Sequence, residues 1–256
     1  MKSVILCGGF GTRLSEATLV KPKPMVEIGN RPILWHIMKI YSYYGYKDFV
    51  LALGYKGEVI KEFFMNYYAM TSDMTVHVGK GKVDISNCSA EDWTVTMIDT
   101  GEDSMTGGRL HRLEHILKPH GTFMLTYGDG VTDLNISELI RFHRSHGKLA
   151  TVTAVRPTAR FGKMVFDGDQ VVDFQEKPQT EEGWINAGFF IFEVGVFDYL
   201  HGDATVLEAD PLENLARDGQ LMAYKYSGFW RCMDTLRDKI ALEEIWATGD
   251  TKWKAY

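Results

Sequence analysis

The chain has 256 residues, of which 45% are hydrophobic, enough to form the core of one large α/β domain or two small ones. Its 28 Lys and Arg are outnumbered by 34 Asp and Glu, and the resulting net charge of −6 argues against a sequence-independent nucleic-acid binder. No run approaches the roughly 18 apolar residues of a membrane span, so we expect a soluble protein with no membrane partner. Cys7, Cys88 and Cys232 lie too far apart in sequence for a local metal clip or a disulfide framework, which favours a reducing cytoplasm.

The N-terminus joins a short apolar strand to a glycine-rich loop. Lys2–Cys7 is largely β-branched and apolar, which predicts a buried first strand, and Gly8–Gly11 follows it directly. Because glycine has no side chain, successive amide N–H groups can turn inward and form a nest for an anion. Thr12 and Arg13 then add a hydroxyl donor and a planar, permanently charged guanidinium. The loop therefore predicts phosphate binding, with a purely structural turn as the alternative.

Two common nucleotide-binding loops do not fit this segment. Leu14 stands where the third glycine of a dinucleotide-binding G-x-G-x-x-G would be. The next expected strand, Asp48–Leu53, ends without a carboxylate that could hold a ribose hydroxyl. The sequence contains no G-x-x-x-x-G-K-[ST], which excludes a P-loop.

Along the chain, apolar runs alternate with helical patterns, which predicts a Rossmann-like α/β fold, a mostly parallel sheet flanked by helices. The expected strands of the first half are 2–7, 48–53, 75–78, 94–98 and 122–127, and its expected helices are 33–45, 57–66 and 110–117. The second half is expected to hold a hairpin over 164–176, an apolar strand over 187–192 and a closing helix over 235–248.

The chain shows no linker or internal repeat, so we expect one domain over residues 1–256. Residues 1–130 would mainly bind a nucleotide and residues 131–256 would supply an elaborated C-terminal half. Ligands of such sheets gather beyond the carboxyl ends of the strands, where the glycine loop and Asp129 both fall. The polar segment 79–93 is expected to be irregular in structure and to form a lid or an arm for oligomerisation.

One lysine and one pair of histidines are candidates for chemistry. Lys23 lies between Pro22 and Pro24, which stiffen its backbone and favour a positioned ammonium over a solvated surface lysine. His111 and His115 are spaced i, i+4 on an expected helix, but the sequence around them offers no Cys or further His for a metal site.

Several motifs, in order along the chain, resemble those of one enzyme family. They are GGFGTRL at 8–14, PKPMVEIGNRPIL at 22–34, TYGDG at 126–130, FQEKP at 174–178, NAGFFIF at 186–192 and FWRCMDTLRD at 229–238. This set is similar to the signature of the sugar-1-phosphate nucleotidylyltransferases. Within that family, SMTGGRL at 104–110 and the WRCMDTLRD ending resemble the members that use CTP and glucose 1-phosphate.

The resemblance implies a reaction, its cofactor and its partners. An oxygen of glucose 1-phosphate attacks the α-phosphorus of CTP in line, pyrophosphate leaves, and the product is CDP-glucose, a precursor for deoxysugars and surface polysaccharides such as O-antigen. Catalysis of this kind depends on aligning two polyanions and neutralising charge on the transferring group. The resemblance also implies Mg²⁺ as the cofactor, a cytoplasmic location and a homo-oligomer.

The family pattern implies roles for four sets of residues. The catalytic pair is Arg13 and Lys23, the metal ligands are Asp129 and Asp234, and the sugar-binding residues are Glu176, Lys177 and Asn186. Nucleotide binding falls on Leu6, Gly8, Gly9, Gly11, Thr12, Arg13, Lys23, Ser104, Thr106, Arg109 and Gly128, of which Ser104, Thr106 and Arg109 would form the base pocket.

Alternatives remain for single residues and for the whole chain. Asp234 could instead cap the closing helix, Asp129 could be a turn residue, and Arg109 could be an exposed helix residue. The chain could also be a guanylyl- or thymidylyltransferase for another sugar 1-phosphate. A third alternative is a sensor of sugar nucleotides that keeps the fold without catalysis.

Overall fold

The inner strands of the central sheet are buried on both faces, as is typical of the parallel sheet of an α/β protein. The computed structural model describes residues 1–11, 14, 18, 20–157, 163–167, 170–175 and 183–254. Its main sheet has seven strands in the order β14-β10-β13-β8-β1-β4-β7. They are β1 (Ser3–Cys7), β4 (Asp48–Leu53), β7 (Thr94–Asp99), β8 (Phe123–Tyr127), β10 (Ala150–Val155), β13 (Ile185–Phe192) and β14 (Leu221–Tyr226).

All neighbouring strands of this sheet are parallel except at β13, which runs antiparallel to both β8 and β10. The carboxyl ends of β1 and β8 therefore lie side by side, with Leu6 paired to Tyr127. The predicted mostly parallel α/β sheet is confirmed. Of the described residues, none belongs to a helix long and apolar enough to cross a bilayer.

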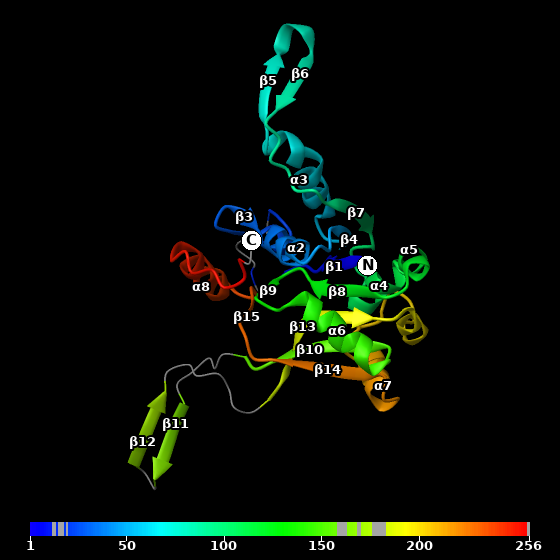
Figure 1. The fold of residues 1–256 in the computed structure, drawn as a ribbon, viewed down its shortest axis with the longest axis vertical. Coiled ribbons are helices and arrows are strands. Elements are labelled where there is room, and N and C mark those ends of the chain that lie inside the picture. Colours follow the sequence, from blue (N-terminus) through cyan, green and yellow to red (C-terminus); the bar gives the residue numbers. More distant parts are fainter. Residues whose placement is uncertain are drawn as a thin grey trace.

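Helices cover both faces of the sheet (Figure 1). They are α2 (Ile33–Tyr43), α3 (Gly57–Met70), α4 (Thr106–Arg112), α5 (Glu114–Leu117), α6 (Ile136–His146), α7 (Asp210–Arg217) and α8 (Leu236–Ala247). Because successive side chains of a strand point to opposite faces, Ile5 packs in one apolar cluster with α2, α3 and α6, whereas Val4 packs in a second cluster with α4, α5 and α7. The sheet is thus the middle of three layers.

The remaining strands form short pairs outside the main sheet. They are β2 (Glu27–Ile28) with β3 (Arg31–Pro32), β5 (Asp73–His77) with β6 (Lys82–Ser86), β9 (Gly130–Thr132) with β15 (Trp230–Cys232), and β11 (Lys163–Asp167) with β12 (Gln170–Gln175). The β9–β15 pair matters for function, because it brings the chain after residue 230 next to the end of β8.

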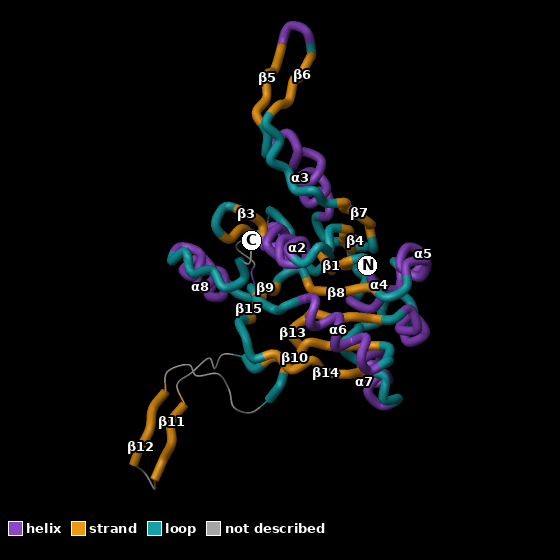
Figure 2. Tube along the Cα trace, in the orientation of Figure 1, coloured by secondary structure: helices purple, strands orange, loops and turns teal. Residues whose placement is uncertain are grey.

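Two expectations for the first half need correction. The segment expected to be irregular after residue 79 contains β6, which pairs with β5 in a hairpin that projects from the body of the molecule (Figure 2). The helix expected over 110–117 begins four residues earlier, at Thr106, and is divided at Leu113 into α4 and α5. In both cases alternating or glycine-containing sequence concealed regular structure.

Candidate active site

A cavity of about 460 Å³ opens where β1, β7 and β8 end, a volume typical of small-molecule sites. Its lining joins the glycine loop, the segment before α4, the end of β8 and the residue that follows β15. The lining residues are Leu6, Cys7, Gly8, Gly9, Phe10, Gly11, Lys23, Pro24, Glu102, Asp103, Ser104, Met105, Thr106, Arg109, Tyr127, Gly128, Asp129, Glu208 and Asp234. The predicted nucleotide-binding residues that the structure describes therefore meet in one pocket.

The glycine loop needs glycine at two of its three positions, for different reasons. A side chain at Gly8 would place its Cβ 2.1 Å from Cζ of Arg109, closer than atoms approach. Gly11 has a φ of +63°, in the left-handed region that favours glycine. At Gly9 the space around a Cβ would be open. The loop is therefore shaped both by its own backbone and by an arginine a hundred residues away.

Arg109 holds three loops together at the carboxyl edge of the sheet. Its guanidinium donates to the backbone oxygens of Gly8, Leu53, Gly101 and Glu102, at 2.6 to 3.1 Å, and to the Thr100 hydroxyl at 3.0 Å. The side chain is only 4% exposed, so the alternative of an exposed helix residue is wrong. Because both terminal nitrogens are committed to the protein, Arg109 contributes to the pocket by fixing its backbone. A direct contact with a nucleobase stays a prediction.

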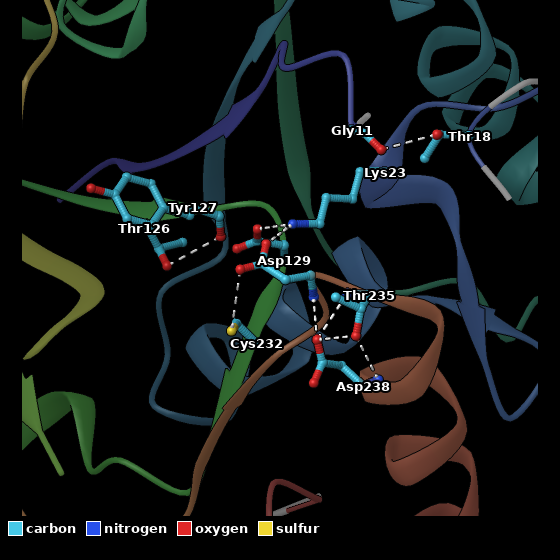
Figure 3. Close-up of polar contacts among 10 residues, drawn as sticks. Gly11, Thr18, Lys23, Thr126, Tyr127, Asp129, Cys232, Thr235 and Asp238 are labelled. Atoms are coloured by element: carbon cyan, nitrogen blue, oxygen red, sulfur yellow. Dashed lines mark hydrogen bonds and ion pairs between the residues drawn. The ribbon is translucent and has the colours of Figure 1, made fainter. Parts of the chain in front are cut away.

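Lys23 projects into the pocket between two carboxylates from distant parts of the chain (Figure 3). Its Nζ lies 2.5 Å from Oδ2 of Asp129 and 2.6 Å from Oδ1 of Asp234. The two carboxylate oxygens are therefore no more than about 5 Å apart, the sum of these distances. Pro22 precedes the short 3-10 turn Lys23–Met25, and Pro24 lies within it, so the backbone that carries the ammonium is stiff.

Asp234 reaches this cluster because another residue caps the following helix. Thr235 is the N-cap of α8, and it forms a capping box with Asp238. The alternative role of Asp234 as the helix cap is therefore wrong. Its carboxylate points instead toward Lys23, with the Cys232 thiol 3.9 Å away.

Charge and burial set the protonation states of this cluster. Burial lowers the pKa of Lys23, but the charges and hydrogen bonds of Asp129 and Asp234 outweigh this and raise its pKa overall, so the lysine is a cation at neutral pH. Burial raises the pKa of Cys232 to about 12, with the nearby carboxylates adding to the effect, and burial also raises the pKa of Cys7 strongly. Both thiols are thus protonated, which agrees with a packing role for Cys7.

The SMTGGRL motif owes much of its pattern to packing. A Cβ at Gly107 or Gly108 would lie 2.9 or 2.2 Å from backbone oxygens of the segment 203–207. The Thr106 hydroxyl donates to Glu208 at 2.6 Å and accepts from the amide of Leu207 at 2.9 Å. Ser104 is 7% exposed and lines the cavity. A base contact by Ser104 or Thr106 stays a prediction.

Tyr127 and Glu208 belong to the pocket but were missed as site residues in the sequence analysis. The Tyr127 hydroxyl donates to Glu208. It also accepts from the side-chain amide of Asn186 at 3.1 Å. The Asn186 Oδ1 in turn accepts from the amide of Gly188 at 2.7 Å. Tyr127 stands within the quoted motif TYGDG, whereas Glu208 carries no sequence signal of its own.

The other predicted residues lie in different positions. Gly128 lets the backbone approach closely, since its Cβ would lie 2.8 Å from the Leu6 carbonyl oxygen. Thr12, Arg13, Glu176 and Lys177 lie outside the described residues, so their roles stay predictions. In the part of the chain that the structure describes, no three His, Cys, Asp or Glu side chains are grouped as a complete metal site.

Comparisons with known proteins agree with this geometry. The nucleotidyl transferase family matches residues 2–235, and the chain therefore belongs to that family. It is 53% identical over 256 residues to a glucose-1-phosphate cytidylyltransferase from Salmonella typhi, with all of both chains covered. It is 32% identical over 259 residues to a mannose-1-phosphate guanyltransferase from Neurospora crassa, covering 98% of this chain and 66% of that protein.

Solved structures share the fold. The inositol-1-phosphate CTP transferase from T. maritima superposes with a TM-score of 0.67 at 13% identity, covering 99% of this chain and 96% of that one. At this identity the likeness shows that the overall fold is shared.

Proposed function

We propose that the chain is an enzyme that transfers a cytidylyl group from CTP to glucose 1-phosphate, giving CDP-glucose and pyrophosphate. The observation that carries the proposal is Lys23, a partly buried cation held by Asp129 and Asp234 inside a pocket that the glycine loop lines. The 53% identity over full length to a cytidylyltransferase favours CTP and glucose 1-phosphate as the substrates.

The residues of the pocket suit phosphoryl transfer by alignment and charge neutralisation. In the proposed arrangement, amides of the Gly8–Gly11 loop and the guanidinium of Arg13 hold the triphosphate. Lys23, charged at neutral pH, contacts the α-phosphate and the incoming sugar phosphate. The attacking oxygen already carries negative charge, so the chemistry requires no general base from the protein.

Asp129 and Asp234 fit a Mg²⁺ ion as the cofactor. Mg²⁺ in nucleotide enzymes takes one or two protein carboxylates and completes its shell with phosphate oxygens and waters, so two facing carboxylates within about 5 Å are a suitable protein contribution. When bound, the ion would neutralise charge on the phosphates. The ammonium of Lys23 lies between the same oxygens, which is consistent with a position that favours a cation.

The rest of the proposal concerns the division of labour and the setting. Residues 1–130 mainly bind the nucleotide, whereas Glu176, Lys177 and Asn186 of the second half bind the sugar phosphate. The enzyme works in the cytoplasm, in line with its dispersed cysteines.

We also propose that copies of the chain associate through the β5–β6 hairpin. One face of this hairpin carries four apolar side chains that are 37% to 54% exposed, those of Met74, Val76, Val83 and Ile85. A two-stranded hairpin alone is only marginally stable in water. Val76→Asp should shift the mass measured by light scattering toward the monomer. An unchanged mass would contradict the assignment of this surface.

The catalytic proposal is tested by pyrophosphate release in the presence of CTP, glucose 1-phosphate and Mg²⁺. We expect release only when all three are present. A sensor of sugar nucleotides would bind CDP-glucose without releasing pyrophosphate, and the cluster of Lys23 with two carboxylates argues against that alternative, because binding alone requires no cation at the reacting phosphate.

A further inference from the structure

Glu208 comes from the second half of the chain and joins two walls of the pocket that the first half forms. Its Oε2 accepts from the Thr106 hydroxyl at 2.6 Å, at the start of α4, and its Oε1 accepts from the Tyr127 hydroxyl at the end of β8. Through Tyr127 the same carboxylate is connected to the Asn186 amide. Glu208 lies just before α7 and lines the cavity.

A carboxylate in this position is unsuited to contact phosphates. The pocket is proposed to receive a triphosphate and a sugar phosphate, and a third anion near them would oppose binding by Coulomb repulsion. Glu208 can only accept hydrogen bonds while it is ionised. Among the described residues, the side-chain donors to it are the hydroxyls of Thr106 and Tyr127.

The two connections of Glu208 differ in how well they are supported by other contacts. On the Thr106 side, the segment 203–207 is also held by backbone bonds, from Met105 N to Asp203 O at 2.9 Å and from Gly108 N to Thr205 O at 3.0 Å. On the Tyr127 side, the Tyr127 hydroxyl donates to Glu208, its acceptor among the described residues. Loss of the carboxylate should therefore disturb Tyr127 more than the nucleotide wall.

The packing of Tyr127 lets it transmit a change at Glu208 to Asn186. Its ring packs against Gly188, where a Cβ would lie 2.3 Å from the ring, and edge-on against Phe190. The neutral phenol donates one hydrogen bond, to Glu208, and accepts another, from Asn186. With its proton directed to Glu208, the phenol oxygen presents a lone pair to the Asn186 amide and fixes its orientation.

We propose that Glu208 is a positioning residue that orients Tyr127, and through it Asn186, for binding of the sugar phosphate. The inference rests on the proposed function in one respect, the placement of the sugar near Asn186. It predicts that Glu208 affects binding of the sugar phosphate and leaves the chemical step and the nucleotide nearly unchanged.

The test compares Glu208→Gln with Glu213→Gln, an exposed residue of α7 outside the cavity lining. Glutamine keeps one accepting oxygen but turns an N–H₂ toward one of the two hydroxyls, so we expect about a tenfold rise in KM for glucose 1-phosphate. KM for CTP and kcat should stay within about threefold of the wild type, and the control should match the wild type. An equal rise in both KM values, or no rise, would overturn the proposal.

Tyr127→Phe gives an independent reading, because it keeps the ring against Gly188 and removes only the hydroxyl. It should reproduce the KM effect of Glu208→Gln, and the double variant should be no worse than either single one. Additive effects would show that Glu208 does not act through Tyr127.

Calorimetric binding of glucose 1-phosphate needs no turnover and so separates this proposal from the proposed function. Glu208→Gln should bind glucose 1-phosphate about tenfold more weakly than the Glu213→Gln control, and Tyr127→Phe should match Glu208→Gln. If the wild type makes no sugar nucleotide, the proposed function fails. If the two glutamine variants bind glucose 1-phosphate equally well, the role given to Glu208 fails.

Discussion

Arg109 offers a direct test of how the pocket is built. A lysine has three N–H donors on one nitrogen, whereas the Arg109 guanidinium donates to five acceptors in the surrounding loops. Arg109→Lys therefore loses at least two hydrogen bonds from a charged donor, each worth about 1.5–3 kcal/mol. Because the site is almost fully buried, the expected loss in the free energy of unfolding is roughly 3–6 kcal/mol.

For a chain of this size that loss lowers the Tm by roughly 10 °C, measurable by calorimetry or circular dichroism. KM for CTP should also rise, because the Gly8 carbonyl is no longer held and the loop amides lose their orientation. Arg112→Lys is a matched control from the same helix, since Arg112 pairs with Asp203 at the exposed surface. Equal changes in Tm and KM for the two variants would refute the role given to Arg109.

Three further predictions concern the cation cluster and acid stability. Lys23→Ala should lower kcat/KM by about a hundredfold or more, whereas Lys21→Ala, which removes only a surface pair with Glu27, should have little effect; equal losses in folded variants would argue against Lys23. Asp234→Asn should weaken Mg²⁺-dependent turnover with little change in Tm, because Asp129 still pairs with Lys23; a large Tm loss with unaltered Mg²⁺ dependence would contradict the metal role. Burial lowers the pKa of His36 to about 4, so between about pH 6.5 and 4 the unfolded chain is protonated at this residue and the folded chain is not. The free energy of unfolding should therefore fall by up to roughly 3 kcal/mol as pH drops through this range. Acid titration of Tm should show this fall in the wild type and a smaller one in His36→Gln, and identical curves would disprove it.

The first half of the fold could be predicted because its strands and helices differ clearly in hydrophobic period. β4 matches its expected bounds, and β1, β7 and β8 each differ from theirs by a single residue. The closing helix was also predicted correctly, since Leu236–Ala247 with its two caps is the expected segment 235–248. The local hydrophobic pattern specifies these elements, so it was sufficient to predict them.

The second half was predicted less completely. α6 and α7 and the strands β10 and β14 were not assigned, although α6 carries a usable signal, the Asn135 N-cap that accepts from Glu138 and the left-handed Gly147 at its end. β14 lies at the sheet edge, and its residues are exposed or half-buried with none fully buried. Its membership of the sheet is decided by pairing with β10, a contact that sequence pattern does not contain.

Prediction of the pocket from sequence is limited in the same way, because long-range contacts leave no local pattern. The motifs located the pocket, but they do not reveal why two of its glycines are required. A Cβ at Gly8 would clash with the Arg109 side chain, and a Cβ at Gly108 would clash with the backbone of Asp203. Glu208 joins the pocket only because the chain before α7 folds over α4. Long-range packing of this kind sets the role of a residue without leaving a local pattern.

One competition experiment tests the central claim most directly. Equimolar CTP, UTP, dTTP and GTP are incubated with the enzyme, Mg²⁺ and limiting glucose 1-phosphate, and the sugar nucleotides formed are resolved by mass spectrometry. We predict that CDP-glucose predominates, because hydrogen bonds to the cytosine amino group would leave unpaired polar groups against uracil, and a pocket shaped for a pyrimidine would exclude guanine. Comparable amounts of GDP-glucose, or no sugar nucleotide at all, would contradict the account.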